Sequence, residues 1–316
     1  MEHSYEVDVG VIYGLDAAEF VDRVVTVDYV GRGVVKSLYA AARKLADGPL
    51  CGRAAELLSE ASVVAVATGF PILRFGGAPE SDGLLSSVLF PRWLEARGGC
   101  AVIFVDEGFE KVAEVGLKAA GAKTSTLIKV SRGVGEETLT SLVVETGADL
   151  LVAVERPGAN KHGQYHNSVG ENITAYTAPL DKVFEKLSRL GKPFIAFGDG
   201  GNEAGMGLIK DAVEMYVPHG EVCRCPCSGG IASTTSATYL VTASISDLGF
   251  YGAMALADNL AYRQTLKNMH HAAEALFAAG CVDAFRGSNN IGVDGLGIDA
   301  VEAVAAILAR IAAREK

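Results

Sequence analysis

The chain has 316 residues, with 28 Lys or Arg against 38 Asp or Glu, so its formal net charge is −10. Hydrophobic residues make up 49% and charged residues 21%, which supplies enough apolar surface for a core and excludes disorder as the dominant state. The acidic balance opposes general binding to nucleic acids or anionic membranes, because phosphate groups repel a chain of this charge.

The N-terminus and the cysteines indicate a compartment. Met1 to Ser4 is polar and acidic, unlike the basic and then apolar start of a secretory signal. No apolar run approaches the ~20 residues that a membrane helix needs. Six cysteines in a chain of this length do not make a disulfide scaffold. We therefore expect a cytoplasmic protein with reduced thiols.

Short apolar runs predict buried parallel strands, because such strands are covered on both faces and read as nearly continuous apolar segments. The clear runs are 61–67, 101–105, 150–154 and 193–197. Weaker strand patterns lie at 24–29, 125–130, 222–227 and 239–244.

Longer segments with helical periodicity lie between these runs, and Pro91 is expected to kink or shorten the helix around it. The predicted helices are 34–45, 52–58, 85–96, 110–120, 136–146, 180–190, 251–279 and 299–313. Alternation of strands and helices predicts an α/β fold with a mainly parallel, doubly wound sheet and helices on both faces.

No linker, charge block or internal repeat divides the chain. We expect a single α/β domain over 1–316. Residues 1–50 are predicted to be an N-terminal extension, a strand and a helix packed on the domain, because they are too few to form a core of their own.

The densest polar motif runs from Gly198 to Gly207, Gly-Asp-Gly-Gly-Asn-Glu-Ala-Gly-Met-Gly, and follows a predicted strand directly. Ligands of open parallel sheets sit beyond the carboxyl ends of the strands, and a glycine-rich turn there allows close approach of backbone N–H groups. Asp199, Asn202 and Glu203 are therefore candidate site residues. The spacing matches neither the dinucleotide fingerprint nor the phosphate-binding P-loop. The alternative is a structural turn with a helix cap.

A second polar segment, 155–168, leaves the end of the strand at 150–154. Charge at the end of an apolar strand needs a partner or a function. Arg156 is a candidate clamp for a carboxylate or phosphate. Glu155 is a candidate base, metal ligand or ion-pair partner of Arg156.

Two further junctions carry polar residues. Thr68 and Gly69 follow the first buried strand, and Glu80 and Asp82 precede the next helix, where they can hold a cation or bind an amine. Equally, Ser81 or Asp82 can cap that helix. Asp247 and Gly249 lie at another strand-to-helix junction, where hydroxyls and free backbone N–H groups can form an anion cradle. Turn chemistry explains much of this pattern without a ligand.

The cysteines of Cys223-Arg-Cys225-Pro-Cys227 alternate, so on a strand they would share one face. A zinc site would need paired Cys-x-x-Cys spacing and a fourth ligand, and neither is evident in the sequence. Buried apolar thiols are the favoured interpretation.

Several of these motifs together resemble one family. The segments are Thr68-Gly-Phe-Pro71, Glu80-Ser-Asp-Gly83, Glu155-Arg-Pro-Gly158 with Gly163-Gln-Tyr165, and the glycine-rich motif at 198–207. They resemble the D-glutamate cyclase C-terminal domain over roughly residues 60–310. Ser246-Asp-Leu-Gly249 is similar to the Ser-Asn-Trp-Gly segment of that family.

The resemblance implies a hydro-lyase that converts D-glutamate into 5-oxo-D-proline and water. The substrate ammonium must then lose a proton to a carboxylate base. The γ-carboxylate must be polarised and its oxyanion stabilised, and the α-carboxylate must be held by an arginine or by backbone N–H groups.

Under that resemblance the catalytic candidates are Asp199, Glu203 and Glu155, with Asp199 or Glu203 as the acid or base. The substrate-binding candidates are Thr68, Gly69, Asp82, Arg156, Gly200, Gly201, Asn202 and Asp247. Asp82, Glu155 and Asp199 are the candidate ligands of a divalent cation, Mg²⁺ or Mn²⁺, and no other cofactor is expected.

Two alternatives stay open. The first is a Mg²⁺-dependent enzyme acting on another small molecule or a phosphate ester. The second is a sensor that binds an amino acid or a nucleotide without turnover, which would tolerate neutralised carboxylates. The expected partner is a small-molecule substrate rather than nucleic acid or membrane, and an alanine-rich, helical surface permits a homodimer.

Overall fold

The computed structural model describes residues 16–313, and its centre is a six-stranded parallel sheet. The strands in chain order are β1 (Val63–Thr68), β4 (Cys100–Asp106), β5 (Thr126–Val130), β6 (Leu150–Val154), β7 (Phe194–Gly198) and β8 (Tyr239–Thr242). Their order across the sheet is β5-β4-β1-β6-β7-β8. The clear strand predictions, and the weaker ones at 125–130 and 239–244, are confirmed.

The strand order reverses at the centre of the sheet, where β1 pairs with both β4 and β6. The chain builds outward from β1 to β5, then returns and builds outward from β6 to β8. This arrangement is the doubly wound α/β fold expected from the sequence, and its ligand crevice opens beyond the carboxyl ends of the strands at the reversal.

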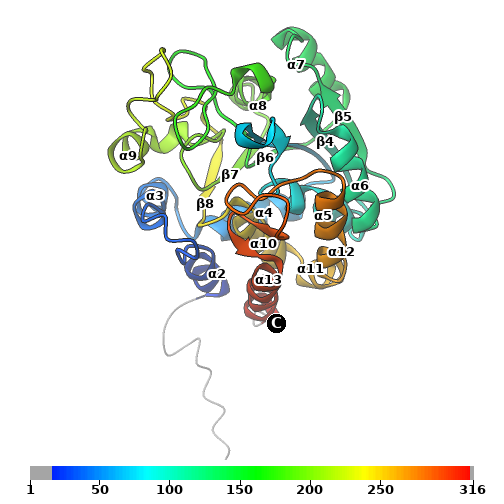
Figure 1. Cartoon of the computed structure of the whole chain (residues 1–316). Coiled ribbons are helices and arrows are strands. Elements are labelled where there is room, and N and C mark those ends of the chain that lie inside the picture. The colour runs from blue at the N-terminus through cyan, green and yellow to red at the C-terminus, as the bar shows by residue number, and fades with distance from the viewer. Residues whose placement is uncertain (1–15, 314–316) are drawn as a thin grey trace, which may run out of the picture.

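Helices cover both faces of the sheet, as Figure 1 shows. On one side lie α7 (Glu136–Glu145) and α8 (Leu180–Arg189), which contact each other. On the other side α5 (Leu84–Glu95), α6 (Glu110–Ala120), α10 (Ser246–Ala257) and α4 (Leu50–Glu60) lie against the sheet or one another. Outside them are α2 (Ala17–Val25), α11 (Asn259–Leu266), α12 (Met269–Ala278) and α13 (Ile298–Ala312). The remaining helices α3 (Val35–Arg43) and α9 (Lys210–Tyr216) lie beside the β8 edge.

Three local predictions are wrong. Residues 24–29 are the end of α2 and a turn, and residues 222–227 form a loop without strand structure. The predicted helix at 251–279 is three helices, α10, α11 and α12. Of the two effects expected of Pro91, shortening is not observed, because helix α5 continues to Glu95.

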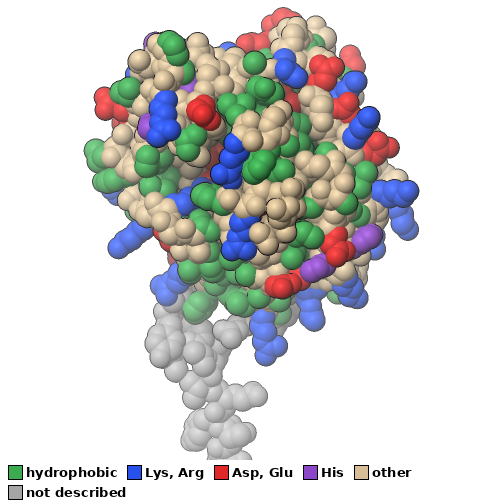
Figure 2. Space-filling model, in the orientation of Figure 1, with side chains coloured by type: hydrophobic (Ala, Val, Ile, Leu, Met, Phe, Trp, Pro, Cys, Tyr) green, Lys and Arg blue, Asp and Glu red, His purple; other side chains and the backbone are tan. Residues whose placement is uncertain are grey.

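The N-terminal segment packs into the main core, as Val21, Leu38 and Leu50 belong to the same buried cluster as the sheet. From residue 16 to residue 50 it contains helices and no strand, and residues 1–15 lie outside the described part. No helix among residues 16–313 is long and apolar enough to cross a membrane. Figure 2 shows Lys and Arg side chains scattered among acidic ones on one face.

Candidate active site

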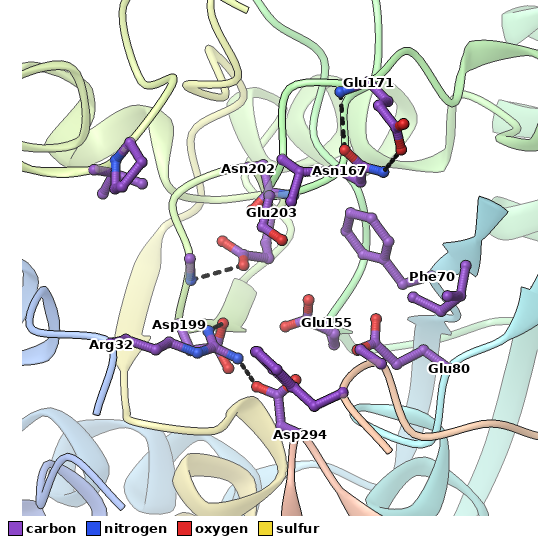
Figure 3. A pocket seen from close by; sticks show the side chains of 18 of the residues that line it. Arg32, Phe70, Glu80, Glu155, Asn167, Glu171, Asp199, Asn202, Glu203 and Asp294 are labelled. Atoms are coloured by element: carbon purple, nitrogen blue, oxygen red, sulfur yellow. Dashed lines mark hydrogen bonds and ion pairs between the residues drawn. The ribbon is translucent and has the colours of Figure 1, made fainter. Parts of the chain in front are cut away.

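A pocket of about 340 Å³ opens beyond the carboxyl ends of β1, β6 and β7, at the reversal of strand order. Its floor is lined by the carboxylates of Glu80, Glu155, Asp199, Glu203 and Asp294. Figure 3 shows Glu80 and Glu155 on one side and Asp199 and Glu203 on the other. Apolar residues form much of the remaining wall: Val34, Phe70, Ile72, Leu73, Val217 and Phe285. A concave, partly apolar pocket with convergent polar groups is the usual form of a small-molecule site.

Glu155 enters the pocket through a strained backbone. It follows the last residue of β6 and has a φ of 43°, a left-handed conformation that is rare for residues other than glycine. Its Oε2 accepts a hydrogen bond of 2.6 Å from the hydroxyl of Ser246 at the start of α10. Gly83 makes room for it, because a Cβ there would lie 2.5 Å from Cβ of Glu155. Such strain clusters at functional sites.

The glycine-rich motif folds around the carboxylate of Glu203. Glu203 Oε1 accepts from the backbone N–H of Gly200 at 2.8 Å, and Oε2 accepts from that of Gly201 at 2.7 Å. The N–H groups of Gly200 and Gly201 therefore already donate to a side chain of the protein. Asn202 reaches out of the loop, and its Nδ2 donates to the backbone carbonyl of His166 at 2.9 Å.

Asp82 and Asp247 cap each other's helices. Asp82 accepts from the backbone N–H groups of Ser246 at 3.1 Å and of Asp247 at 2.9 Å, at the start of α10. Asp247 Oδ1 accepts from the N–H of Ser86 at 3.2 Å, in the first turn of α5. The first N–H groups of a helix have no intrahelical partners and favour a negative charge. Asp82 therefore caps α10, which is distant in the chain, rather than the helix that directly follows it.

Arg32 is a site residue that the sequence analysis missed. It lies between α2 and α3, lines the pocket, and its guanidinium forms ion pairs with Asp199 and Asp294. The other oxygen of Asp199, Oδ2, is buried and has no hydrogen-bond partner among the described residues. No local pattern marks Arg32, because its partner Asp199 is 167 positions away in the chain.

The electrostatics of the pocket are dominated by excess negative charge. Burial, reinforced by the charges of Asp199 and Glu203, raises the pKa of Glu155 well above its usual range. Burial and Asp199, opposed by Arg32, raise the pKa of Glu80 to about 8. Burial and Asp199 also raise the pKa of Glu203 to about 7, against its backbone hydrogen bonds. Perturbed carboxylates in a cleft are typical of functional sites.

Asp82, Glu155 and Asp199 converge. Each offers one oxygen atom, and these three atoms lie within 4.8 Å of one another. All three residues are buried. The pKa of Asp82 is raised well above its usual range by burial and then by the charge of Asp247. Carboxylate oxygens are the ligands that Mg²⁺ and Mn²⁺ prefer, and the unpartnered Oδ2 of Asp199 leaves one free to coordinate. The donor set therefore fits a hard divalent cation.

Arg156 lies outside the pocket lining. Its guanidinium is completely buried and pairs with Asp106, and it also donates to the backbone carbonyls of Thr68 and Ala178. Asp106 in turn accepts from the N–H of Ala178 at 2.7 Å. This placement ties the ends of β1 and β4 to the loop before α8, and it does not support the prediction that Arg156 holds a substrate carboxylate.

Thr68 and Gly69 lie behind the pocket wall rather than on its lining. Gly69 has a φ of 106°, and a Cβ there would lie 2.9 Å from the ring of Phe109. The hydroxyl of Thr68 is buried without a hydrogen-bond partner in the described chain. In the sequence, the site was indicated by the polar residues that follow the predicted strands. Glu80, which lines the pocket, is one of the polar residues between the first strand and the next helix.

Comparison with known proteins places this site in a family. A family model described as D-glutamate cyclase-like, C-terminal, matches residues 23–309. The chain belongs to this family. The mitochondrial D-glutamate cyclase of Homo sapiens is 31% identical over 207 residues, which cover 61% of this chain and 32% of the human protein. The chain thus spans about a third of the length of that relative. The segment matched by the family model includes Arg32.

Proposed function

We propose that this chain cyclises a small acidic amino acid, D-glutamate in the first instance, to 5-oxoproline with loss of water. The observation that carries the proposal is the buried cluster of Asp82, Glu155 and Asp199, in a member of a D-glutamate cyclase-like family. Glu155 and Asp199 line the pocket, and Asp82 lies beside them, outside the lining. A substrate with two carboxylates would be repelled by so acidic a pocket unless a cation bridged the charges.

Asp82, Glu155 and Asp199 are the residues that would hold a divalent cation, Mg²⁺ or Mn²⁺. Such an ion supplies positive charge that polarises a substrate carboxyl group. All three ligands are buried, which keeps the place partly dry and strengthens the effect of the ion's charge on the substrate. Arg32 fixes one oxygen of Asp199 by its ion pair and leaves the other unpaired.

Glu80 is the proposed proton carrier. The α-amine forms a bond to the γ-carboxyl carbon, and one γ-oxygen leaves with the two protons that the ammonium gives up, as water. Glu80 is buried and lines the pocket, so its carboxylate can take a proton from the ammonium and return it to the departing oxygen. Glu203 instead holds the glycine loop in shape through its two backbone hydrogen bonds.

Arg74 is the proposed anchor for a substrate carboxylate. It lines the pocket, its side chain is exposed, and it forms no ion pair with the described residues. Its loss is expected to raise KM about tenfold with little change in kcat, as for one charge-assisted hydrogen bond. Arg263→Gln, an exposed arginine on α11, is the matched control for Arg74→Gln.

The direct test is incubation of the purified chain with D- or L-glutamate, with and without Mg²⁺ or Mn²⁺, followed by measurement of 5-oxoproline. Formation of 5-oxoproline that depends on the cation supports the proposal. Calorimetric binding of glutamate without any product would instead favour the non-catalytic sensor. Hydrolysis of phosphate esters, with no turnover of glutamate, would favour the phosphate-ester alternative.

A further inference from the structure

A second cluster lies apart from the carboxylates, where the segment between β6 and β7 meets the segment between α9 and β8. The structure brings His166 to the three cysteines of the Cys-x-Cys-x-Cys segment, Cys223, Cys225 and Cys227. The four ligand atoms lie within 4.8 Å of one another. This arrangement supplies the fourth ligand that the sequence analysis could not find.

The distances describe a closed four-ligand cage. Cys223 Sγ lies 3.5 Å from Cys225 Sγ and 3.3 Å from Cys227 Sγ. His166 Nε2 lies 3.2 Å from Cys225 Sγ and 3.5 Å from Cys227 Sγ. In a tetrahedral zinc site, bond lengths of ~2.3 Å to sulfur and ~2.0 Å to nitrogen place neighbouring ligand atoms ~3.5 to ~3.8 Å apart. The four distances given are therefore within about 0.5 Å of that geometry.

We propose that His166, Cys223, Cys225 and Cys227 form a structural zinc site. Three cysteines and one histidine are an established ligand set for structural Zn²⁺. Soft thiolate ligands favour Zn²⁺ over Mg²⁺ and Mn²⁺, the hard cations that carboxylate ligands prefer. The thiols release their protons to solvent as they bind the ion. With four protein ligands the coordination is complete, so no position is open for a substrate.

The surroundings of Cys227 are polar rather than apolar. Cys227 Sγ accepts from the backbone N–H of Gly229 at 3.4 Å and from Nδ2 of Asn160 at 3.6 Å. Cys225 and Cys227 are only partly buried, and the segment is a loop rather than a strand. Cys223 is buried, so the interpretation as buried thiols fits this cysteine and does not fit the other two.

The ion would fix one wall of the carboxylate pocket. The carbonyl of His166 accepts from Nδ2 of Asn202 in the glycine-rich motif, and the next residue, Asn167, lines the pocket. The N–H of Arg224, between two of the cysteines, donates to the carbonyl of Gly170 at 3.0 Å. Zinc would therefore join the loop at 166–170 to the loop at 223–227, two segments without regular structure.

Metal analysis of tag-free wild-type protein, expressed with added zinc and purified under reducing conditions, is the first experiment. The expected result is one zinc per chain, released when an organomercurial blocks the thiols. After replacement by Co²⁺, the same protein should show thiolate-to-cobalt charge transfer and the intense visible bands of tetrahedral Co²⁺. This spectrum requires no variant and reports the ligands directly.

Variants then assign the ligands. Cys225→Ser and His166→Gln are expected to bring zinc to background and to abolish the tetrahedral cobalt spectrum, whereas Cys100→Ser, a partly exposed cysteine outside the cluster, keeps both. Folded wild-type protein without stoichiometric zinc and without the cobalt spectrum would overturn the proposal. So would an iron–sulfur chromophore, a disulfide between cluster cysteines in the freshly isolated protein, or full zinc retention by Cys225→Ser. The readout does not depend on glutamate turnover.

Discussion

Replacement of Glu80 by glutamine is expected to stabilise the protein and to lower its turnover. Glu80 is 6% exposed, and burial and Asp199 raise its pKa from 4.5 to about 8. The folded chain therefore binds the Glu80 proton more tightly than the unfolded chain does. An amide has nearly the same shape and carries no charge that burial could penalise.

The raised pKa sets the direction of the pH dependence. Below pH 4.5 the carboxyl is protonated in both states, and it costs the folded state nothing. Between pH 4.5 and about 8 the unfolded chain releases the proton first, so stability falls as pH rises, and above pH 8 the loss is constant. A rise from 4.5 to about 8 corresponds to at most ~5 kcal/mol at ~1.4 kcal/mol per unit.

The expected gain for Glu80→Gln is smaller than that limit, because the pocket opens to solvent and the shift is shared with Asp199. We expect about 2 kcal/mol at pH 8, or roughly a 4 °C rise in Tm for a domain of this size. At pH 5 most of this difference should vanish. Turnover should fall by about 10²- to 10⁴-fold, the usual contribution of a general acid or base.

The assay is thermal unfolding from pH 5 to pH 8 without added divalent cation, paired with 5-oxoproline formation. Glu114→Gln, an exposed glutamate on α6, is the control, and it should leave the pH dependence unchanged. A Glu80→Gln protein that is no more stable than wild type at pH 8 would refute the electrostatic reasoning. Undiminished turnover by the folded variant would refute the role of Glu80 as proton carrier.

Two further predictions concern the support of the site. Gly83→Ala should destabilise the protein by about 3 kcal/mol in denaturant unfolding, because its Cβ would collide with Glu155. Gly76→Ala is the control: Gly76 has a similar φ but open space around it, so the loss should be about 1 kcal/mol. Equal losses of stability in the two variants would contradict this account of Gly83. Arg156→Met should destabilise by about 3 to 5 kcal/mol, because it leaves Asp106 buried and unpaired. A near-normal unfolding midpoint with a raised KM would instead support the prediction that Arg156 binds a substrate carboxylate.

Much of the fold follows from local sequence pattern. The strand predicted at 150–154 is observed with those bounds, and the polar residues after β1, β6 and β7 do meet at one edge of the sheet. Both results depend on short-range signals: apolar runs, and the rule that parallel strands present their carboxyl ends together.

The residues that were missed depend on contacts between distant parts of the chain. Arg32 reaches Asp199 across 167 positions, and His166 reaches Cys225 across 59. Neither pairing leaves a local motif. The cysteines at every second position have the same spacing as residues on one face of a strand. This spacing predicts a strand at Val222 to Cys227, where the structure has a loop. Ligand geometry in a loop is set by the fold rather than by spacing alone.

The central claim is that the carboxylate cluster holds a divalent cation, and titration of Mn²⁺ into the purified protein tests it most directly. Paramagnetic resonance or calorimetry should show one strong Mn²⁺ site, weakened at least tenfold in Asp199→Asn. Asp211→Asn, an exposed aspartate on α9, should bind Mn²⁺ as wild type does. Folded wild-type protein without a strong Mn²⁺ site, or equal Mn²⁺ affinity in the Asp199→Asn and wild-type proteins, would contradict the account.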